Sequence, residues 1–201
     1  MENTNTDFKN TLESVLEYMK AKNYIIYTKE FQLNVVGIRT KNGEVNRFTD
    51  YIHLFYKDPN DSWVHYVFNC TVDPGLTYMR KLLNPAGAGA LVAGQYIDTY
   101  AIDKHQGKYD ALCQRLKPVS VYRDRNLDDV YNYDKTTIQT GMFGVNIHCA
   151  GLDSMYVENW SAACMVYKRK ADFLQMMKLA YKHKELYGNV FTYTLIDLNL
   201  K

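Results

Sequence analysis

The chain is poor in several features that mark whole classes of protein. Its 201 residues include only four cysteines and four prolines, and the formal net charge is +2. No two cysteines form a Cys-X-X-Cys pair, so they predict neither a disulfide scaffold nor a structural zinc site. A net charge near zero argues against a dedicated nucleic-acid binder, which usually carries a basic face. We therefore expect no metal site and no nucleic-acid partner, and nothing in the sequence requires a cofactor.

Long apolar runs are also missing. The longest stretch of small and apolar residues, 86–94, is too short and too rich in glycine to span a bilayer. Residues 1–7 have neither the basic region nor the apolar region of a secretory signal. We therefore expect no transmembrane segment and a protein made and kept in a cytoplasm, where reducing conditions suit unpaired thiols.

Apolar and aromatic residues, by contrast, are plentiful. Apolar residues make up 47% of the chain, and there are 18 tyrosines. This is enough to bury one core, so residues 1–201 are interpreted as a single domain. The tyrosines fit a β-rich fold, in which aromatic side chains pack well on pleated surfaces. The sequence indicates no particular oligomeric state.

Apolar side chains recur at helical spacing near the N-terminus. They are Phe8, Leu12, Val15, Leu16 and Met19. This pattern predicts an amphipathic helix over residues 7–22 that packs on the flank of the domain. One of Asn5, Thr6 and Asp7 is expected to cap its N-terminus.

Most of the remaining chain favours β-structure. Candidate strands are residues 24–27, 31–39, 51–57, 63–71, 119–123, 144–148, 164–167 and 190–196. Two further helices are predicted, over residues 76–83 and 171–183, the second with a buried apolar side. The glycines in residues 86–94 predict a loop with tight bends. The expected fold is therefore α+β, mainly β.

The densest cluster of reactive side chains lies between residues 144 and 166. His148 ends one β-like run, and Cys164 begins another sixteen residues later. Two strand ends can lie side by side, and a nearby imidazole both activates a thiol and accepts its proton. Spacing alone leaves a second interpretation open, in which Cys164 is a small buried hydrophobe and His148 a hydrogen-bonded core histidine.

The amino-acid sequence of these two runs resembles that of the L,D-transpeptidase catalytic domain. That family's motif is a histidine, about fifteen residues and then Ser-X-Gly-Cys; here His148 is followed by fifteen residues ending in Ser161-Ala-Ala-Cys164. Phe143-Gly-Val-Asn-Ile-His148 and Asn159-Trp-Ser-Ala-Ala-Cys164 are most similar to a divergent branch from phages and bacteria. Softer landmarks extend the resemblance over about residues 30–180, in an L,D-transpeptidase-like β-rich domain with flanking helices.

The resemblance implies a mechanism on the peptide stems of peptidoglycan. Cys164 would be the nucleophile that forms a thioester, and His148 would be its general base. Ser161 would orient the histidine or bind substrate, and the N–H groups of Ala163 and Cys164 would form the oxyanion hole. An amine acceptor would give a cross-link, whereas water would give cleavage of an L–D bond.

Four other residues are candidates for substrate binding. A strand-end arginine, Arg123, suits a stem-peptide carboxylate, although a surface ion pair is the plainer interpretation. Asn146 shares a strand face with His148. Trp160 either walls the cleft or fills the core, and His105 either lines the cleft or is solvated in a turn.

Two features set this chain apart from the family pattern and keep other functions open. Ala163 stands where the family has glycine, and Val166 replaces a polar residue. These changes favour an alternative in which the chain is a non-catalytic wall-binding or structural module, such as part of a virus particle. A papain-like amidase that pairs Cys113 with His148 is another alternative. With no export signal, the enzyme hypothesis favours a phage lysis or virion protein that cleaves the wall after release.

Overall fold

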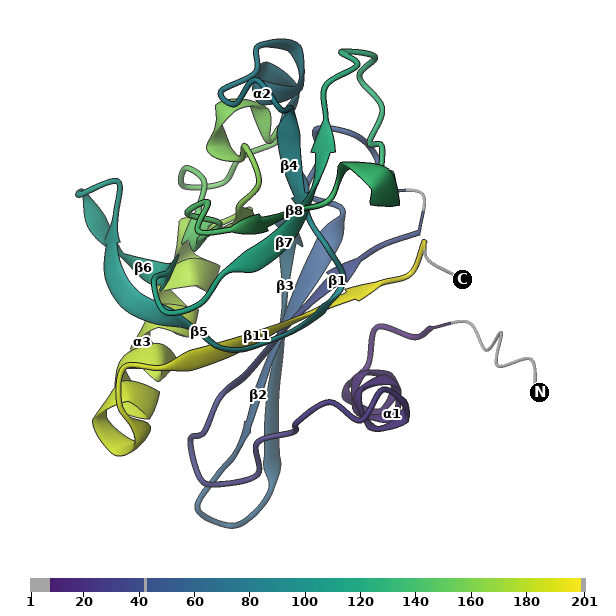
Figure 1. Ribbon diagram of the computed structural model, residues 1–201. Helices are drawn as coiled ribbons and strands as arrows, with labels where there is room; N and C mark the ends of the chain where they lie inside the picture. The colour runs from purple at the N-terminus through teal and green to yellow at the C-terminus, as the bar shows by residue number, and fades with distance from the viewer. Residues whose placement is uncertain (1–7, 42, 200–201) are drawn as a thin grey trace, which may run out of the picture.

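The computed structural model describes residues 8–41 and 43–199, and this part of the chain is α+β and mainly β (Figure 1). The helices are α1 (Leu12–Ala21), α2 (Leu76–Arg80) and α3 (Lys170–Tyr187), with 3₁₀ turns η1 (Lys135–Thr137) and η2 (Glu158–Trp160). The strands are β1 (Asn34–Arg39), β2 (Asp50–Lys57), β3 (Trp63–Thr71), β4 (Ala88–Leu91), β5 (Gly94–His105), β6 (Tyr109–Gln114), β7 (Val119–Asp124), β8 (Gln139–Gly141), β9 (Ile147–Cys149), β10 (Met165–Tyr167) and β11 (Phe191–Asp197).

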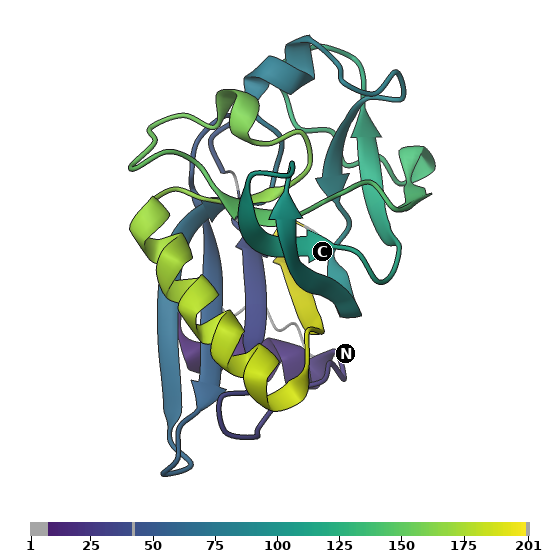
Figure 2. The same cartoon turned by 90° about the vertical axis from the view of Figure 1, so that its left-hand side faces the viewer.

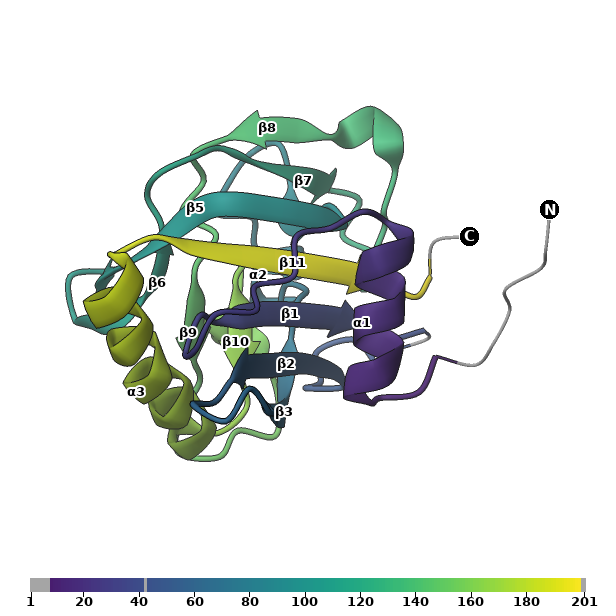
Figure 3. The ribbon, with the colours of Figure 1, turned by 90° about the horizontal axis from the view of Figure 1, so that it is seen from below.

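Eight of the strands close into a barrel. Their order is β1-β11-β5-β6-β9-β10-β3-β2, and β2 pairs with β1 to complete the circle. Two neighbouring pairs, β1–β11 and β9–β10, are parallel, and the others are antiparallel. The remaining strands form a second, three-stranded sheet in the order β4-β7-β8. Figure 3 shows this second sheet to one side of the barrel strands.

Strands β1 and β11 are buried along their whole length because both of their faces are covered. Val35 and Leu195 belong to the main core, whereas Val36 and Ile196 pack with α1 in a second apolar cluster. Helix α1 thus lies on the flank of the barrel, as its amphipathic pattern predicts. Its observed N-cap is Thr11, whose side chain accepts a hydrogen bond from the N–H of Ser14.

The expected start of the first helix was too early. The helix begins at Leu12, so residue 8 precedes it, and the predicted caps among residues 5–7 lie outside the described part of the chain. Helix α3 begins one residue before the predicted range and extends four residues beyond it. Its expected buried residues, Phe173, Met176, Met177 and Ala180, all belong to the main core. Figure 2 shows α3 lying across the barrel strands.

Several strand predictions need correction. Residues 24–27 form no strand, because side-chain amides replace a neighbouring strand: Gln95 accepts from the N–H of Ile25, and Asn34 accepts from that of Tyr27. The predicted glycine loop contains β4, where Gly89 allows close approach of another segment. Strands β5, β6 and β8 were not predicted, because their mixed polar sequences carry no clear period of two.

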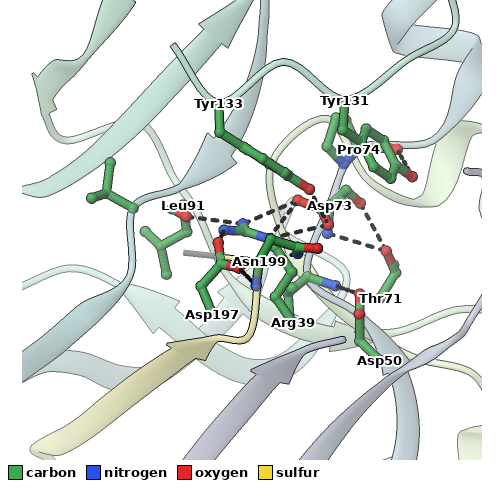
Figure 4. A network of polar contacts seen from close by, with 12 residues as sticks. Arg39, Asp50, Thr71, Asp73, Pro74, Leu91, Tyr131, Tyr133, Asp197 and Asn199 are labelled. Atoms are coloured by element: carbon green, nitrogen blue, oxygen red, sulfur yellow. Dashed lines mark hydrogen bonds and ion pairs between the residues drawn. The ribbon is translucent and has the colours of Figure 1, made fainter. Parts of the chain in front are cut away.

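A buried ion cluster joins the barrel to the second sheet (Figure 4). Arg39 of β1 is 1% exposed and pairs with Asp73 at 3.0 Å and with Asp197 of β11 at 2.7 Å. Its guanidinium also lies 4.5 Å from the centre of the Tyr133 ring and donates to the carbonyl of Leu91, the last residue of β4. Segments from five parts of the chain therefore meet at one charge.

This cluster contains more acid than base. Burial and the nearby Asp73 carboxylate raise the pKa of Asp50 to about 7. The Asp50 carboxyl accepts hydrogen bonds from the N–H groups of Thr40 and Val72. A cavity of about 260 Å³ lies beside the cluster.

Within the residues that the structure describes, no helix is long and apolar enough to cross a membrane.

Candidate functional site

The parallel pairing of β9 with β10 brings His148, on β9, near the turn that ends at Cys164, the residue before β10. Val166 lies opposite His148, and the N–H of Met165 donates to the carbonyl of Asn146 at 3.0 Å. One step back along the same register, Cys164 is next to Asn146. Continued by one residue, the alternation of side chains would put Cys164 on the same side as His148, although their side chains make no hydrogen bond to each other among the described contacts.

The Cys164 thiol is held by backbone groups of the neighbouring segment. Its sulfur accepts from the N–H of Asn146 at 3.4 Å and donates to the carbonyl of Gly144 at 3.6 Å. The residue is partly exposed, but its thiol group is enclosed, and this burial raises its pKa to about 11. The thiol is therefore protonated at neutral pH.

His148 is buried and held in one tautomer. Its Nδ1 lies 3.0 Å from the carbonyl oxygen of Cys149, an acceptor that requires the proton to be on Nδ1. The Tyr109 hydroxyl is 3.3 Å from the same nitrogen. Nε2 is buried and has no hydrogen-bond partner within the described residues. Burial and the adjacent His105 lower the pKa of His148 to about 3, so the imidazole is neutral and Nε2 carries a free lone pair.

His105 is part of this site. Its ring stacks on that of His148 with centroids 4.0 Å apart, and its Nδ1 lies 3.0 Å from the amide nitrogen of Asn146. Only 6% of His105 is exposed, so the solvated interpretation of this residue is wrong. Asn146 binds His105 rather than His148, and its oxygen accepts from the N–H of Gln114.

The turn before Cys164 is fixed from three directions. The Ser161 hydroxyl donates to the carbonyl of Cys164 at 2.8 Å, and the Ser161 carbonyl accepts from the N–H of Gly75 at 2.8 Å. The carbonyl of Ala162 accepts from the N–H of Gly89 in β4 at 2.9 Å. Ser161 therefore holds the turn, and within the described contacts its hydroxyl binds neither histidine.

The same turn presents two unused donors. The N–H groups of Ala163 and Cys164 make no hydrogen bond to any acceptor in the described part of the chain. Ala163 is not among the described non-glycine residues with positive φ, so alanine is unstrained where the family has glycine. A Cβ placed on Gly89 would lie 2.7 Å from that of Ala163, so Gly89 supplies the space that Ala163 needs.

Arg123 of β7 lies beside this turn and lacks an anionic partner. It is 8% exposed, it makes no ion pair within the described residues, and its Nη2 has no hydrogen-bond partner there. Its other nitrogens donate to Gln139 and to the carbonyl of Gly87, and its guanidinium lies 4.5 Å from the centre of the Phe143 ring. The plainer interpretation of a surface ion pair is therefore wrong for Arg123.

The guanidinium and the turn share one neighbour, Gly89. A Cβ built on Gly89 would lie 3.5 Å from Nη1 of Arg123 as well as in contact with Ala163. Burial without a counter-ion lowers the pKa of Arg123. A buried guanidinium without a carboxylate is costly unless an anion compensates it.

Two other candidates, Trp160 and Cys113, make no hydrogen bond to Cys164 or His148 among the described contacts. Trp160 is 40% exposed and lines a separate cavity with Tyr109 and Cys149. Cys113 is fully buried, its thiol donates to the carbonyl of Asp103, and burial raises its pKa. No group of three or more His, Cys, Asp or Glu side chains within the described residues is arranged to hold a metal ion.

Gln114 is a positioning residue that the sequence did not reveal. Its Oε1 accepts from the N–H groups of Phe143, Gly144 and Val145, and its Nε2 donates to the carbonyls of Lys117 and Gly141. The segment that leads to His148 is therefore bonded to one side chain instead of extending β9, which begins at Ile147. No local sequence signal distinguishes a glutamine with this role.

Comparisons of the chain with protein-family models, curated proteins and solved structures give no match.

Proposed function

We propose that this protein is a cysteine-dependent acyl-transfer enzyme of the L,D-transpeptidase type. The observation that carries the proposal is the parallel register of β9 and β10, in which His148 lies opposite Val166, two residues after Cys164. The free Nε2 of His148 and the unused N–H groups of the Ala163–Cys164 turn support it. Acyl transfer needs a base, a thiol and oxyanion donors, and these residues would supply all three.

In the resting site both partners are neutral, so the proton moves during attack. Nε2 of His148 takes the thiol proton while the sulfur bonds to the substrate carbonyl carbon. The N–H groups of Ala163 and Cys164 stabilise the oxyanion. Its collapse breaks the C–N bond, and the histidinium returns the proton to the leaving amine. Water or a second amine then attacks the thioester and regenerates the thiol.

The contacts of His105 and Tyr109 help to keep the base in place. The stacked His105 ring fixes the plane of the His148 ring, and Tyr109 lies beside Nδ1. The backbone carbonyl of Cys149 stabilises the imidazolium when it forms during the reaction. A backbone oxygen thus takes the orienting role that a carboxylate plays in other triads.

The substrate we propose is the peptide stem of peptidoglycan, with cleavage of an L–D bond. The motif around His148 and Cys164 supports this choice. Arg123 is suited to a carboxylate of the stem, because its guanidinium is buried without a counter-ion beside Ala163.

Purified sacculi test the proposal. Wild type should release fragments cut at L–D bonds, detected by mass spectrometry, and Cys164→Ala should release none. Cys70→Ala is the matched control, because this thiol, on β3, is also buried in the main core, and it should keep activity. Equal activity of wild type and Cys164→Ala would refute the role of Cys164, and loss of activity only in Cys113→Ala would favour the amidase alternative.

One observation favours a second function, that of a non-catalytic wall-binding module. The thiol and imidazole are both neutral at rest, and each is bonded to backbone groups rather than to the other. Sedimentation of the protein with sacculi, without release of fragments by wild type, would support this module and contradict the enzyme.

A further inference from the structure

A cavity larger than the one beside Arg39 has neither Cys164 nor His148 in its lining. It has a volume of about 530 Å³, within the usual range for small-molecule sites. Its walls come from β6, from the segment after β9, from η2 and from the first turns of α3. Cys149 reaches it from the core face of β9, opposite to the face that carries His148.

The lining of this cavity is mainly apolar, and its rim exposes apolar groups to solvent. Phe173 and Met177 form part of the wall. Leu152 is 84% exposed, Leu174 is 54% exposed and Trp160 is 40% exposed. Apolar side chains gathered around a cavity mouth indicate a binding site for an apolar group. A polar peptide stem, the substrate proposed for Cys164, does not account for them.

One uncompensated charge lies at this cavity. Asp110 is already neutralised, because it pairs with Lys104 at 2.7 Å and accepts a hydrogen bond from the Tyr181 hydroxyl. Lys170, at the start of α3, makes no ion pair within the described residues. The cavity therefore combines an apolar interior with a single available cation.

We propose that this cavity binds a monomeric amphiphile with a linear apolar body and one anionic head group, such as a fatty carboxylate. The chain of the ligand would lie between Phe173 and Met177, and its head group would contact Lys170. The proposed ligand contacts do not involve Cys164, although Tyr109, whose hydroxyl lies 3.3 Å from Nδ1 of His148, also lines the cavity.

Fluorescence of Trp160 provides the test. Trp63→Phe leaves Trp160 as the only tryptophan, since the chain has two. Titration with sodium dodecanoate below its micellar range should change this fluorescence saturably. Dodecyltrimethylammonium, which has the same chain and the opposite charge, should bind more weakly. Lys170→Met should weaken dodecanoate binding by roughly three- to fivefold, the effect of one exposed ion pair.

A pair of variants on α3 separates the cavity from general surface effects. Leu174→Glu puts a negative charge at the rim and should weaken dodecanoate binding by more than about tenfold. Leu186→Glu is the matched control, because Leu186 is 46% exposed on the same helix and does not line the cavity, and it should bind like wild type. Circular dichroism checks that each variant is folded.

Three results would overturn the proposal. One is the absence of saturable binding of dodecanoate to folded protein. Another is equal binding by the Leu174→Glu and Leu186→Glu variants, which would place the probe elsewhere. The third is binding to anionic vesicles without binding of monomeric dodecanoate, which would assign the surface to a membrane instead.

Discussion

The resting protonation state of Cys164 can be tested directly by its alkylation rate as a function of pH. Burial raises the pKa of this thiol to about 11, two units above its usual value of 9.0. Two units correspond to about 2.7 kcal/mol against the thiolate. At pH 7 only about one molecule in ten thousand should carry a thiolate at this position. We therefore expect Cys164 to react about a hundredfold more slowly than an unperturbed thiol.

The shape of the profile is more informative than the absolute rate. Because only the thiolate reacts, the iodoacetamide rate at Cys164 should rise about tenfold for each pH unit from 7 to 10, with no plateau. An imidazolium–thiolate pair would instead give a plateau at lower pH. His148→Gln should leave the profile unchanged, because the neutral imidazole makes no ion pair with the thiol, yet it should abolish turnover of sacculi.

The assay is mass spectrometry of the peptide that contains Cys164 after timed labelling. The other three cysteines are buried. Combined cleavage after Lys, Arg and Glu cuts at Glu158 and so separates Cys149 from Cys164, and each cysteine is followed on its own peptide. A cysteine-containing model peptide gives the unperturbed rate, and circular dichroism at each pH confirms that the protein is folded. A plateau below pH 8 would refute the neutral resting pair and the step in which His148 takes the proton during attack.

Three further predictions concern stability and the turn. Arg39→Met leaves Asp73 buried without its cation and should lower the free energy of unfolding in urea by about 3–5 kcal/mol; an unchanged midpoint would contradict this. Burial and a neighbouring histidine lower the pKa of His53 to about 3. As the pH drops below about 6.5, the unfolded state therefore takes up a proton that the folded state does not, and the free energy of unfolding decreases by about 1.4 kcal/mol per pH unit. His53→Asn should reduce the slope by this amount, while the similar contribution of His148 and the opposite one of Asp50 remain in both proteins, and equal slopes would count against it. Gly89→Ala should reduce turnover of sacculi, because its Cβ would lie 2.7 Å from that of Ala163 and would displace the turn. Adding Ala163→Gly removes the second Cβ and should restore turnover. If the double variant stays slow, this contact is not the cause.

Local patterns predicted much of the secondary structure. The period of the apolar residues predicted α3 and the flank helix α1, and the strand over Trp63–Thr71 was predicted with its observed bounds. Strands that depend on a partner were missed, because β4 and β8 are short and their pairing with β7 is not encoded in a local period. Residues 24–27 have strand-forming side chains, but distant amides satisfy their backbone.

The sequence by itself determined which thiol and imidazole to consider, because residue types and spacing around His148 and Cys164 are local properties. Only the tertiary structure decided their state. The carbonyl of Cys149 fixes the imidazole tautomer, and burial keeps both groups neutral. The fold also buries Arg123 away from every carboxylate that could pair with it within the described residues. Desolvation and hydrogen bonding depend on which distant segments fold around a group, and a single sequence does not contain that information locally.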